Sequence, residues 1–394
     1  MVACVRHCTP QGKVTRQTRT FATHTAALLS LLDWLQAEGV SHAALESTGV
    51  YWKPVFHLLE GHLEVLLVNA RHVKQVPGRK TDVKDAAWLA ELLQHGLLRA
   101  SFVPPAPIRQ LRDRTRQRTR LAEEKAAAAN RIQKVLEDAS LKLASVATDV
   151  LGESGRDMLR ALIAGETDSV ALAELARGRL RAKIPQLQLA LRGRVTEHRR
   201  FLLQPYLEHV DHLEGLMRRL SGRVEEVLAP QAGTVDRLKT IPGVSDRLAE
   251  VLVAELGTDM SPFPSADHLA SWAGMCPGLD QSAGKRRSGR VPMGNRWLKQ
   301  ALVQAGWAAS HTKGTYLSAQ YHRLAQRRGR KRAVVALGHT LLVIVYHVLR
   351  RGGEYQELGA GYLDALASDR LTRQLVRRLE KLGHKVTLEP CAVN

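Results

Sequence analysis

Ser282 is the residue of this sequence that is best placed for nucleophilic chemistry on a phosphate. It lies two residues before Gly284, in the stretch Gly274 to Lys299 (GMCPGLDQSAGKRRSGRVPMGNRWLK), whose glycines and prolines predict a loop. Asn295 can cap a following helix, whose N-terminus supplies free N–H groups for an anion. Four cations follow the serine and could neutralise a phosphodiester: Lys285, Arg286, Arg287 and Arg290. This stretch alone favours a simpler interpretation, a solvated basic loop that binds nucleic acid without chemistry.

Three carboxylates could form a second reactive group. Glu46 follows a predicted strand, and Asp82 and Asp85 lie one turn apart at the start of a predicted helix. Hard cations such as Mg²⁺ take oxygen ligands, and phosphoryl-transfer sites collect several carboxylates. The neighbouring Lys80 and Lys84 could reach a phosphate backbone. The alternative is that the aspartates complement the helix dipole and that Glu46 is a solvent-facing strand end.

The charge balance points to a polyanionic partner. The 394 residues include 58 Lys and Arg against 38 Asp and Glu, a formal charge of +20, which favours DNA or RNA. An anionic membrane surface is the weaker alternative, because the basic residues are spread along the whole chain. Within one basic run, 327–332, Arg330 and Lys331 are candidate phosphate contacts, or alternatively part of an exposed loop.

The remaining composition predicts a soluble protein of a reducing cytoplasm. The four cysteines form no paired CxxC motif and no disulfide framework. The longest apolar run, Val334 to Leu349, contains a glycine, a threonine and two histidines, so it predicts a buried helix and no membrane span.

Residues 1–105 are expected to form an α/β domain. Two strands are predicted at Val2–Arg6 and Lys13–Phe21, and strands and helices then alternate through a buried strand at Leu63–Asn69. This order implies helices packed on a sheet. It would place Glu46 at the carboxyl edge of the sheet, where sites tend to form.

The rest of the chain is predicted to be mainly helical. After a linker at 104–110, residues 106–232 read as a helical hairpin or loose coiled coil, which spaces or dimerises its neighbours, with breaks at Pro185 and Pro205. Residues 233–352 open with a turn at Gly243 that resembles half of a helix-hairpin-helix, a motif that holds a DNA phosphate by backbone N–H groups. Residues 353–394 form a tail with one amphipathic helix, Asp369–Leu382.

Four motifs, taken together and in order, resemble the IS110-family transposases, most closely the IS1111-like branch. They are LESTGVYW with Glu46, KTDVKDA with Asp82 and Asp85, IPGVSDRLAEVLVAELG, and the serine stretch continued to MGNRWLKQALVQAGWA. The resemblance implies an N-terminal RuvC-like domain of RNase H fold with a DEDD carboxylate set binding Mg²⁺. Glu46, Asp82 and Asp85 match the second to fourth members of that set, and Ser282 matches the family's nucleophile.

The resemblance also implies function and partners. Such enzymes recombine the DNA of their insertion element through a serine–DNA intermediate, guided by a structured non-coding RNA. Their active site is composite, with carboxylates and serine from different subunits of a dimer or tetramer. The expected location is the bacterial cytoplasm, in association with the nucleoid.

One departure from the family concerns its first aspartate. That aspartate belongs to a strand before the segment that matches Val2–Arg6, whereas the first acidic residue here is Asp33, in a predicted helix. The expectation is an upstream start codon or a truncated copy, with a sheet that lacks a central strand. The alternatives to an active recombinase are therefore an inactive copy that only binds DNA or RNA, and a junction nuclease that uses the carboxylates alone.

Overall fold

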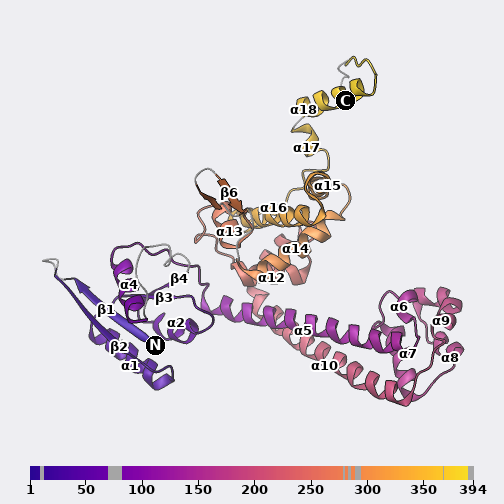
Figure 1. Ribbon diagram of the computed structural model, residues 1–394, viewed down its shortest axis with the longest axis horizontal. Coiled ribbons are helices and arrows are strands. Elements are labelled where there is room, and N and C mark those ends of the chain that lie inside the picture. The colour runs from indigo at the N-terminus through magenta and orange to yellow at the C-terminus, as the bar shows by residue number, and fades with distance from the viewer. Residues whose placement is uncertain are drawn as a thin grey trace. The chain divides into compact units, whose positions relative to one another are not determined.

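The computed structural model describes residues 1–8, 13–69, 82–277, 280–282, 285–288, 294–366 and 368–388, with the backbone only at 82–84, 280–282, 285–288, 369–371 and 374. The chain divides into two compact units, the N-terminal unit Met1–Pro104 and the C-terminal unit Pro105–Asn394 (Figure 1). The C-terminal unit therefore includes the predicted coiled coil.

The N-terminal unit is α/β. Its strands form two ladders: β1 (Val2–Cys8) antiparallel to β2 (Val14–Thr20), and β3 (His42–Glu46) parallel to β4 (Glu64–Val68). Its helices are α1 (Thr25–Ala37), α2 (Trp52–Leu59) and α4 (Asp82–Gln94). Within the described residues no ladder joins β1 to β3. In the part of the chain that the structure describes, the two ladders are thus separate.

The core of the N-terminal unit depends on the helical periodicity of α1. Leu28, Leu31, Leu32 and Leu35 recur at three- and four-residue spacing and are all buried. They pack with residues of β1 and α2 in one apolar cluster. The helix ends at Glu38, followed by Gly39 at a φ of 65°, a conformation that glycine adopts without strain.

Two long helices, α5 (Ala106–Asp138) and α10 (Glu197–Leu228), form the predicted hairpin and lie side by side in Figure 1. They are antiparallel, because Leu121 packs with Met217 whereas Ile132 clusters with Leu203, farther towards the start of α10. The expected linker at 104–110 is wrong, because α5 already begins at Ala106 with a proline in its first turn, where no intrahelical N–H is needed. The expected break at Pro205 is also wrong, because α10 continues through it.

Between α5 and α10 the chain forms a helical cap that the sequence did not reveal as a separate element. It comprises α6 (Leu143–Val146), α7 (Glu153–Ala164), α8 (Ser169–Glu174), the 3-10 helix η1 (Gly178–Lys183) and α9 (Ile184–Ala190). Its fully buried Met158, Leu172 and Leu187 share one core with the C-terminal part of α5 and the N-terminal part of α10. Pro185 lies in the first turn of α9, so a new helix starts there.

The rest of the C-terminal unit is a helical core. After the 3-10 helix η2 (Ala229–Gln231) come α11 (Ala232–Lys239), α12 (Asp246–Leu256), α13 (Ala266–Trp272), α14 (Arg296–Ser310), α15 (Tyr316–Arg328) and α16 (Arg330–Arg351). By length and composition α16 could cross a membrane, but half of its apolar window is buried. It packs on α11, α13, α14 and α15, which confirms the predicted buried helix. The tail contains α17 (Tyr362–Ala365) and α18 (Ser368–Lys381).

Glycines allow α14 and α16 to cross closely. A Cβ on Gly306 would lie 3.1 Å from the Val334 carbonyl oxygen, and one on Gly338 would lie 3.2 Å from that of Leu302. Since real Cβ atoms rarely approach so closely, larger residues would push the two helices apart.

Candidate active site

Glu46 is the last residue of β3. The parallel register pairs it with Val68, which places it at the carboxyl ends of two strands. Its side chain is half-buried, and the Thr48 hydroxyl donates a hydrogen bond of 3.1 Å to its Oε1. The Ser47-Thr48-Gly49 turn therefore orients the carboxylate.

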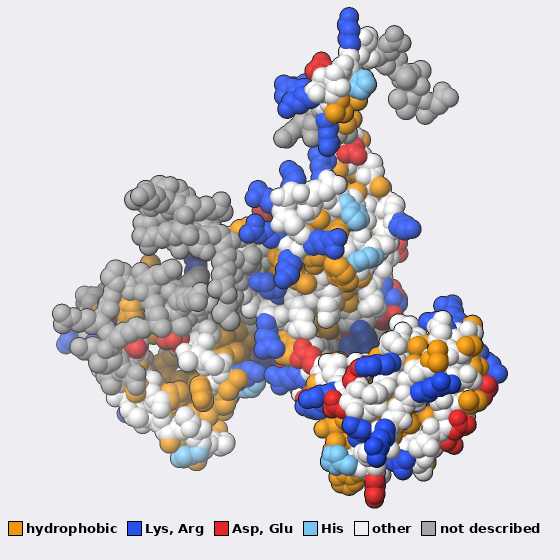
Figure 2. Space-filling view, turned by 45° about the vertical axis from the view of Figure 1, so that its right-hand side comes forward, with side chains coloured by type: hydrophobic (Ala, Val, Ile, Leu, Met, Phe, Trp, Pro, Cys, Tyr) orange, Lys and Arg blue, Asp and Glu red, His pale blue; other side chains and the backbone are white. Residues whose placement is uncertain are grey.

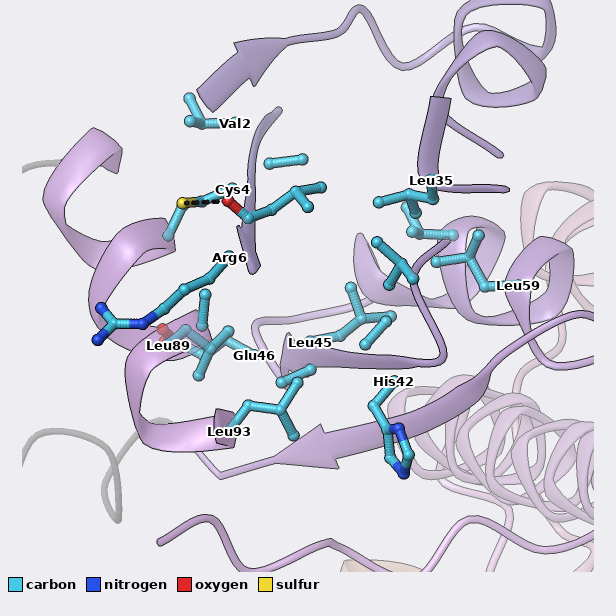
Figure 3. A pocket seen from close by; sticks show the side chains of 18 of the residues that line it. Val2, Cys4, Arg6, Leu35, His42, Leu45, Glu46, Leu59, Leu89 and Leu93 are labelled. Carbon is cyan, nitrogen blue, oxygen red and sulfur yellow. Dashed lines mark hydrogen bonds between the residues drawn. The ribbon is translucent and has the colours of Figure 1, made fainter. Parts of the chain in front are cut away.

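A cleft of about 1230 Å³ lies between the two ladders of the N-terminal unit (Figure 3). Cys4 and Arg6 of β1 line one wall, Leu45 and Glu46 of β3 another, and α4 contributes Leu89 and Leu93, among others. Asp85, also on α4, lines the same cleft. The structure thus brings together two of the three predicted carboxylates.

The fit to a divalent cation depends on these carboxylates. Asp82 begins α4 one turn before Asp85, as predicted, but its side chain lies outside the described part of the chain. Among the described residues, no group of three or more His, Cys, Asp or Glu side chains could hold a metal ion. Two half-buried carboxylates on one cleft are nevertheless hard oxygen donors, the ligand type that Mg²⁺ takes.

The serine stretch contains a β-hairpin where the sequence predicted only loop. β5 (Asp280–Ser282) runs antiparallel to β6 (Lys285–Ser288), and Ser282 pairs with Lys285. Ser282 is therefore the last residue of β5, and the predicted cations Lys285, Arg286 and Arg287 form most of β6.

The two ends of this stretch meet at one place. A Cβ on Gly294 would lie 2.2 Å from the Ala273 carbonyl oxygen, so only glycine fits this crossing. The Lys299 ammonium donates to the Gly274 carbonyl at 3.4 Å, and the Met275 N–H donates to that of Ala270 at 2.9 Å. The two segments that flank the hairpin are therefore in contact with each other, and we call this contact the base of the hairpin.

Asn295 caps α14 as predicted. Its Oδ1 accepts hydrogen bonds from the backbone N–H groups of Trp297 and Leu298, at 3.1 and 3.2 Å. Its Nδ2 donates to Oε2 of Glu255, at 2.6 Å. Both polar groups of the side chain are therefore engaged within the protein.

Sequence reasoning missed Glu255, which is fully buried on α12. Arg116 of α5 binds its carboxylate with two hydrogen bonds of 2.7 and 2.8 Å. Arg112, also of α5, lies 3.2 Å from Oε2 and donates to the Glu255 carbonyl at 2.7 Å. Burial lowers the pKa of the Arg112 guanidinium, and the charge of Glu255 opposes that shift. The available signal was a lone carboxylate inside the apolar run of VLVAEL.

The predicted nucleic-acid contacts have several different environments. A Cβ on Gly243 would lie 2.5 Å from the Ala305 carbonyl oxygen, so this glycine, at a φ of 86°, packs its turn against α14. Arg330 and Lys331 are exposed in the first turn of α16, and only Gly329 separates α16 from α15, so the loop considered there is reduced to that residue. Lys80, Gly284 and Arg290 lie outside the described residues, as do the side chains of Lys84 and of the cations on β6.

Among the described residues that Figure 2 shows in colour, lysine and arginine side chains occur on many different parts of the surface. This distribution agrees with the even spread of basic residues along the sequence. It suits a partner that touches many parts of the chain.

Two family models match the chain in the order of its motifs. A model of the IS110 transposase DEDD domain matches residues 2–140, and a model of the IS116/IS110/IS902 transposase family matches residues 235–323. Together they cover more than half of the chain. The chain therefore belongs to the IS110 family of transposases.

Individual relatives agree with this assignment. A "Probable family 20 transposase" of Pseudomonas aeruginosa is 25% identical over 78% of this chain and 83% of its own length. The "Insertion element IS110 uncharacterized 43.6 kDa protein" of Streptomyces coelicolor is 32% identical over 30% of this chain, and the "Pilin gene-inverting protein" of Moraxella bovis is 30% identical over 30% of it. The matched segments span only 29% and 38% of these last two relatives.

Proposed function

We propose that this protein is a DNA recombinase that moves an insertion element by cutting and rejoining DNA strands. In this proposal Ser282 is the nucleophile, and Glu46, Asp82 and Asp85 are ligands of Mg²⁺. The observation that supports it most directly is that Glu46 and Asp85 line one cleft of the unit that matches the IS110 DEDD domain.

The proposed reaction is a phosphoryl transfer to serine. The Ser282 hydroxyl loses its proton, and Oγ bonds to a phosphorus as the bond from that phosphorus to the leaving strand breaks. The leaving oxygen takes up a proton, and the reverse step rejoins a strand without ATP because the phosphoserine diester conserves the bond energy. A serine hydroxyl is a weak nucleophile at neutral pH. When bound, Mg²⁺ would supply Lewis-acid activation.

The basic residues have two roles in this proposal. Lys285, Arg286 and Arg287 lie on the strand that pairs with β5, and Lys285 is the partner of Ser282, so in this proposal they stabilise the extra negative charge of the pentacoordinate transition state. The charge of +20 would hold the DNA of the element and target, together with a guide RNA. The proposed assembly is a homodimer or homotetramer.

Trapping of a covalent adduct tests the serine. The full chain is incubated with Mg²⁺ and a duplex carrying the joined element ends, and the protein–DNA adduct is measured on a denaturing gel. We expect Ser282→Ala to abolish the adduct, while Ser288→Ala, on the other strand of the hairpin, retains it. An equal adduct from Ser282→Ala and the parent would show that the serine assignment is wrong.

Glu46→Gln tests the carboxylates in the same assay. It removes one proposed ligand charge and should lower the adduct rate by about 100-fold or more. Glu64→Gln is the matched control, because Glu64 is an exposed residue at the opposite end of the ladder. Cutting by Ser282→Ala without an adduct would instead indicate a junction nuclease.

A second candidate is a non-catalytic copy that only binds DNA or RNA. It is favoured by the separation of the two ladders among the described residues of the N-terminal unit. It predicts steeply salt-dependent binding and no cleavage with or without Mg²⁺.

A further inference from the structure

We propose that Glu255 is a positioning residue for the Ser282 hairpin. It holds Asn295, where the hairpin stretch returns to helix α14, and it is itself held by two arginines of α5. The expected effect on the rate of adduct formation rests on the proposed function, whereas the expected effect on the hydrogen exchange of the hairpin stretch does not.

The carboxylate of Glu255 is fully buried and fully engaged. Arg116 occupies both oxygens, and Arg112 and Asn295 share Oε2. A buried carboxylate is stable only with such donors, so α5 and α12 are fixed to each other at this point. A second ion pair between the same helices, Arg118 with Glu250 at 2.5 Å, adds to that attachment.

Glu255 fixes the orientation of the Asn295 amide. An ionised carboxylate only accepts hydrogen bonds, so the NH₂ group of Asn295 must face Glu255. The amide oxygen then faces the first N–H groups of α14, where it forms the cap. The bond to Glu255 therefore sets the position of the residue that ends the hairpin stretch.

The position of Asn295 affects the hairpin through its base. The preceding residue, Gly294, lies against the Ala273 carbonyl, where the other end of the stretch begins. On the helix side, the ring of Trp297 is covered by the guanidinium groups of Arg116, Arg120 and Arg296, at 4.7 to 5.7 Å. Arg116 thus contacts both Glu255 and the first turn of α14. Because Gly294 lies against Ala273 at the other end of the stretch, a shift of the neighbouring Asn295 would move one end of the hairpin relative to the other.

Two substitutions separate this role from simple capping. Serine and aspartate cap helices about as well as asparagine, but aspartate has no N–H to donate, and the serine hydroxyl ends one bond short of the Asn295 Nδ2 that reaches Glu255. Asn295→Ser therefore keeps a cap and removes the bond to Glu255, whereas Asn295→Asp keeps the cap and sets two carboxylates together. Thr196→Asp, at the N-cap of α10, is the matched control because its cap has no such partner.

Two measurements on the full chain test the proposal. Hydrogen exchange of residues 275–295 should accelerate about tenfold in Asn295→Ser, as expected for loss of a hydrogen bond to a charged group, and more in Asn295→Asp. The rate of adduct formation should fall by a similar factor. Thr196→Asp should change neither quantity.

The possible outcomes distinguish the inference from the proposed function. If Asn295→Ser shows the same hydrogen-exchange rate at residues 275–295 and the same rate of adduct formation as the unsubstituted chain, the positioning role of Glu255 is wrong. If Ser282→Ala retains the adduct, the proposed function fails, but the exchange of residues 275–295 still decides the role of Glu255. If Asn295→Asp does not fold, Asn295→Ser provides the test alone.

Discussion

In the N-terminal unit two of the candidate carboxylates, Glu46 and Asp85, line a cleft between two separate ladders, whereas in the C-terminal unit the candidate serine lies on a hairpin with a fixed base. Among the described residues, the Glu46 carboxylate accepts a hydrogen bond from the Thr48 hydroxyl in its own turn. The base of the Ser282 hairpin is held by the bond from Asn295 to the buried Glu255, by the ion pair of Glu255 with Arg116, and by the close approach of Gly294 to Ala273.

This difference shows two ways of placing a reactive group. A carboxylate that binds a cation can gain its final geometry from the cation, so a loosely held ligand is tolerable before binding. The position of a serine nucleophile is not set by its binding to a cation in this way, so the surrounding protein must orient it. The following predictions test this contrast, from the largest expected effect to the smallest.

Loss of the Glu255 carboxylate should have the largest effect on stability. Glu255→Ala leaves the half-buried Arg112 and Arg116 without the carboxylate that they share and should destabilise the C-terminal unit by about 3 kcal/mol. Hydrogen exchange of peptides from each unit measures the change. Glu226→Ala, at an exposed position on α10, is the control and should cost less than about 0.5 kcal/mol. An equally small effect of Glu255→Ala would remove the contrast between the units.

Truncation of a buried leucine should cost more in the C-terminal unit. Leu252 on α12 and Leu59 on α2 are 0% and 1% exposed, but Leu59 also lines the cleft. We expect Leu252→Ala to cost about 3 kcal/mol and Leu59→Ala about 2 kcal/mol, because a side chain beside an existing void has fewer contacts to lose. Denaturant titration followed by exchange in each unit compares them. Equal costs would mean that the cleft wall is as well packed as the helical core.

Two glycines of the C-terminal unit should respond in opposite directions. Gly243→Ala forces a Cβ to 2.5 Å from a backbone oxygen at a positive φ and should cost about 1–3 kcal/mol. Gly222 lies inside α10, and an added Cβ there would meet nothing within 4 Å, so Gly222→Ala should add about 0.5–1 kcal/mol. Thermal unfolding of both variants measures the difference. A stabilising Gly243→Ala would show that the turn can move away from α14.

The smallest effect concerns acid stability of the helical hairpin. Burial raises the pKa of Glu214, but its hydrogen bond to Lys125 and the charge of Arg156 outweigh burial, so the net pKa is lowered. A lowered pKa contributes stability above the unfolded value of about 4.3, and this contribution is lost as the pH falls through the folded value. Glu214→Gln should therefore flatten the acid-side loss of stability below about pH 4.5, measured by unfolding at several pH values. Glu226→Gln is expected to leave that slope closer to the parental one.

Local patterns predicted much of the fold because they reflect short-range physics. The leucine spacing of α1, the valine-rich strand β4 and the asparagine cap of α14 each depend on residues within a few positions. The predictions at 104–110 and Pro205 failed because proline was taken as a break, whereas it is tolerated in a first turn and, at an exposed position of a long packed helix, in the interior. The cap of α6 to α9 was missed because its short helices gain stability only from a shared core.

The sequence by itself determined the family, the order of the motifs and the identity of the candidate catalytic residues, because these depend on residue types at fixed spacing. Only the tertiary structure decided that Glu46 and Asp85 share a cleft, that Ser282 ends a strand, and that Glu255 supports Asn295. Glu255 and Asn295 are 40 residues apart, and Arg116 is 139 residues from Glu255. No local pattern encodes such a pairing, because the burial that makes a carboxylate require these donors exists only after the helices have packed.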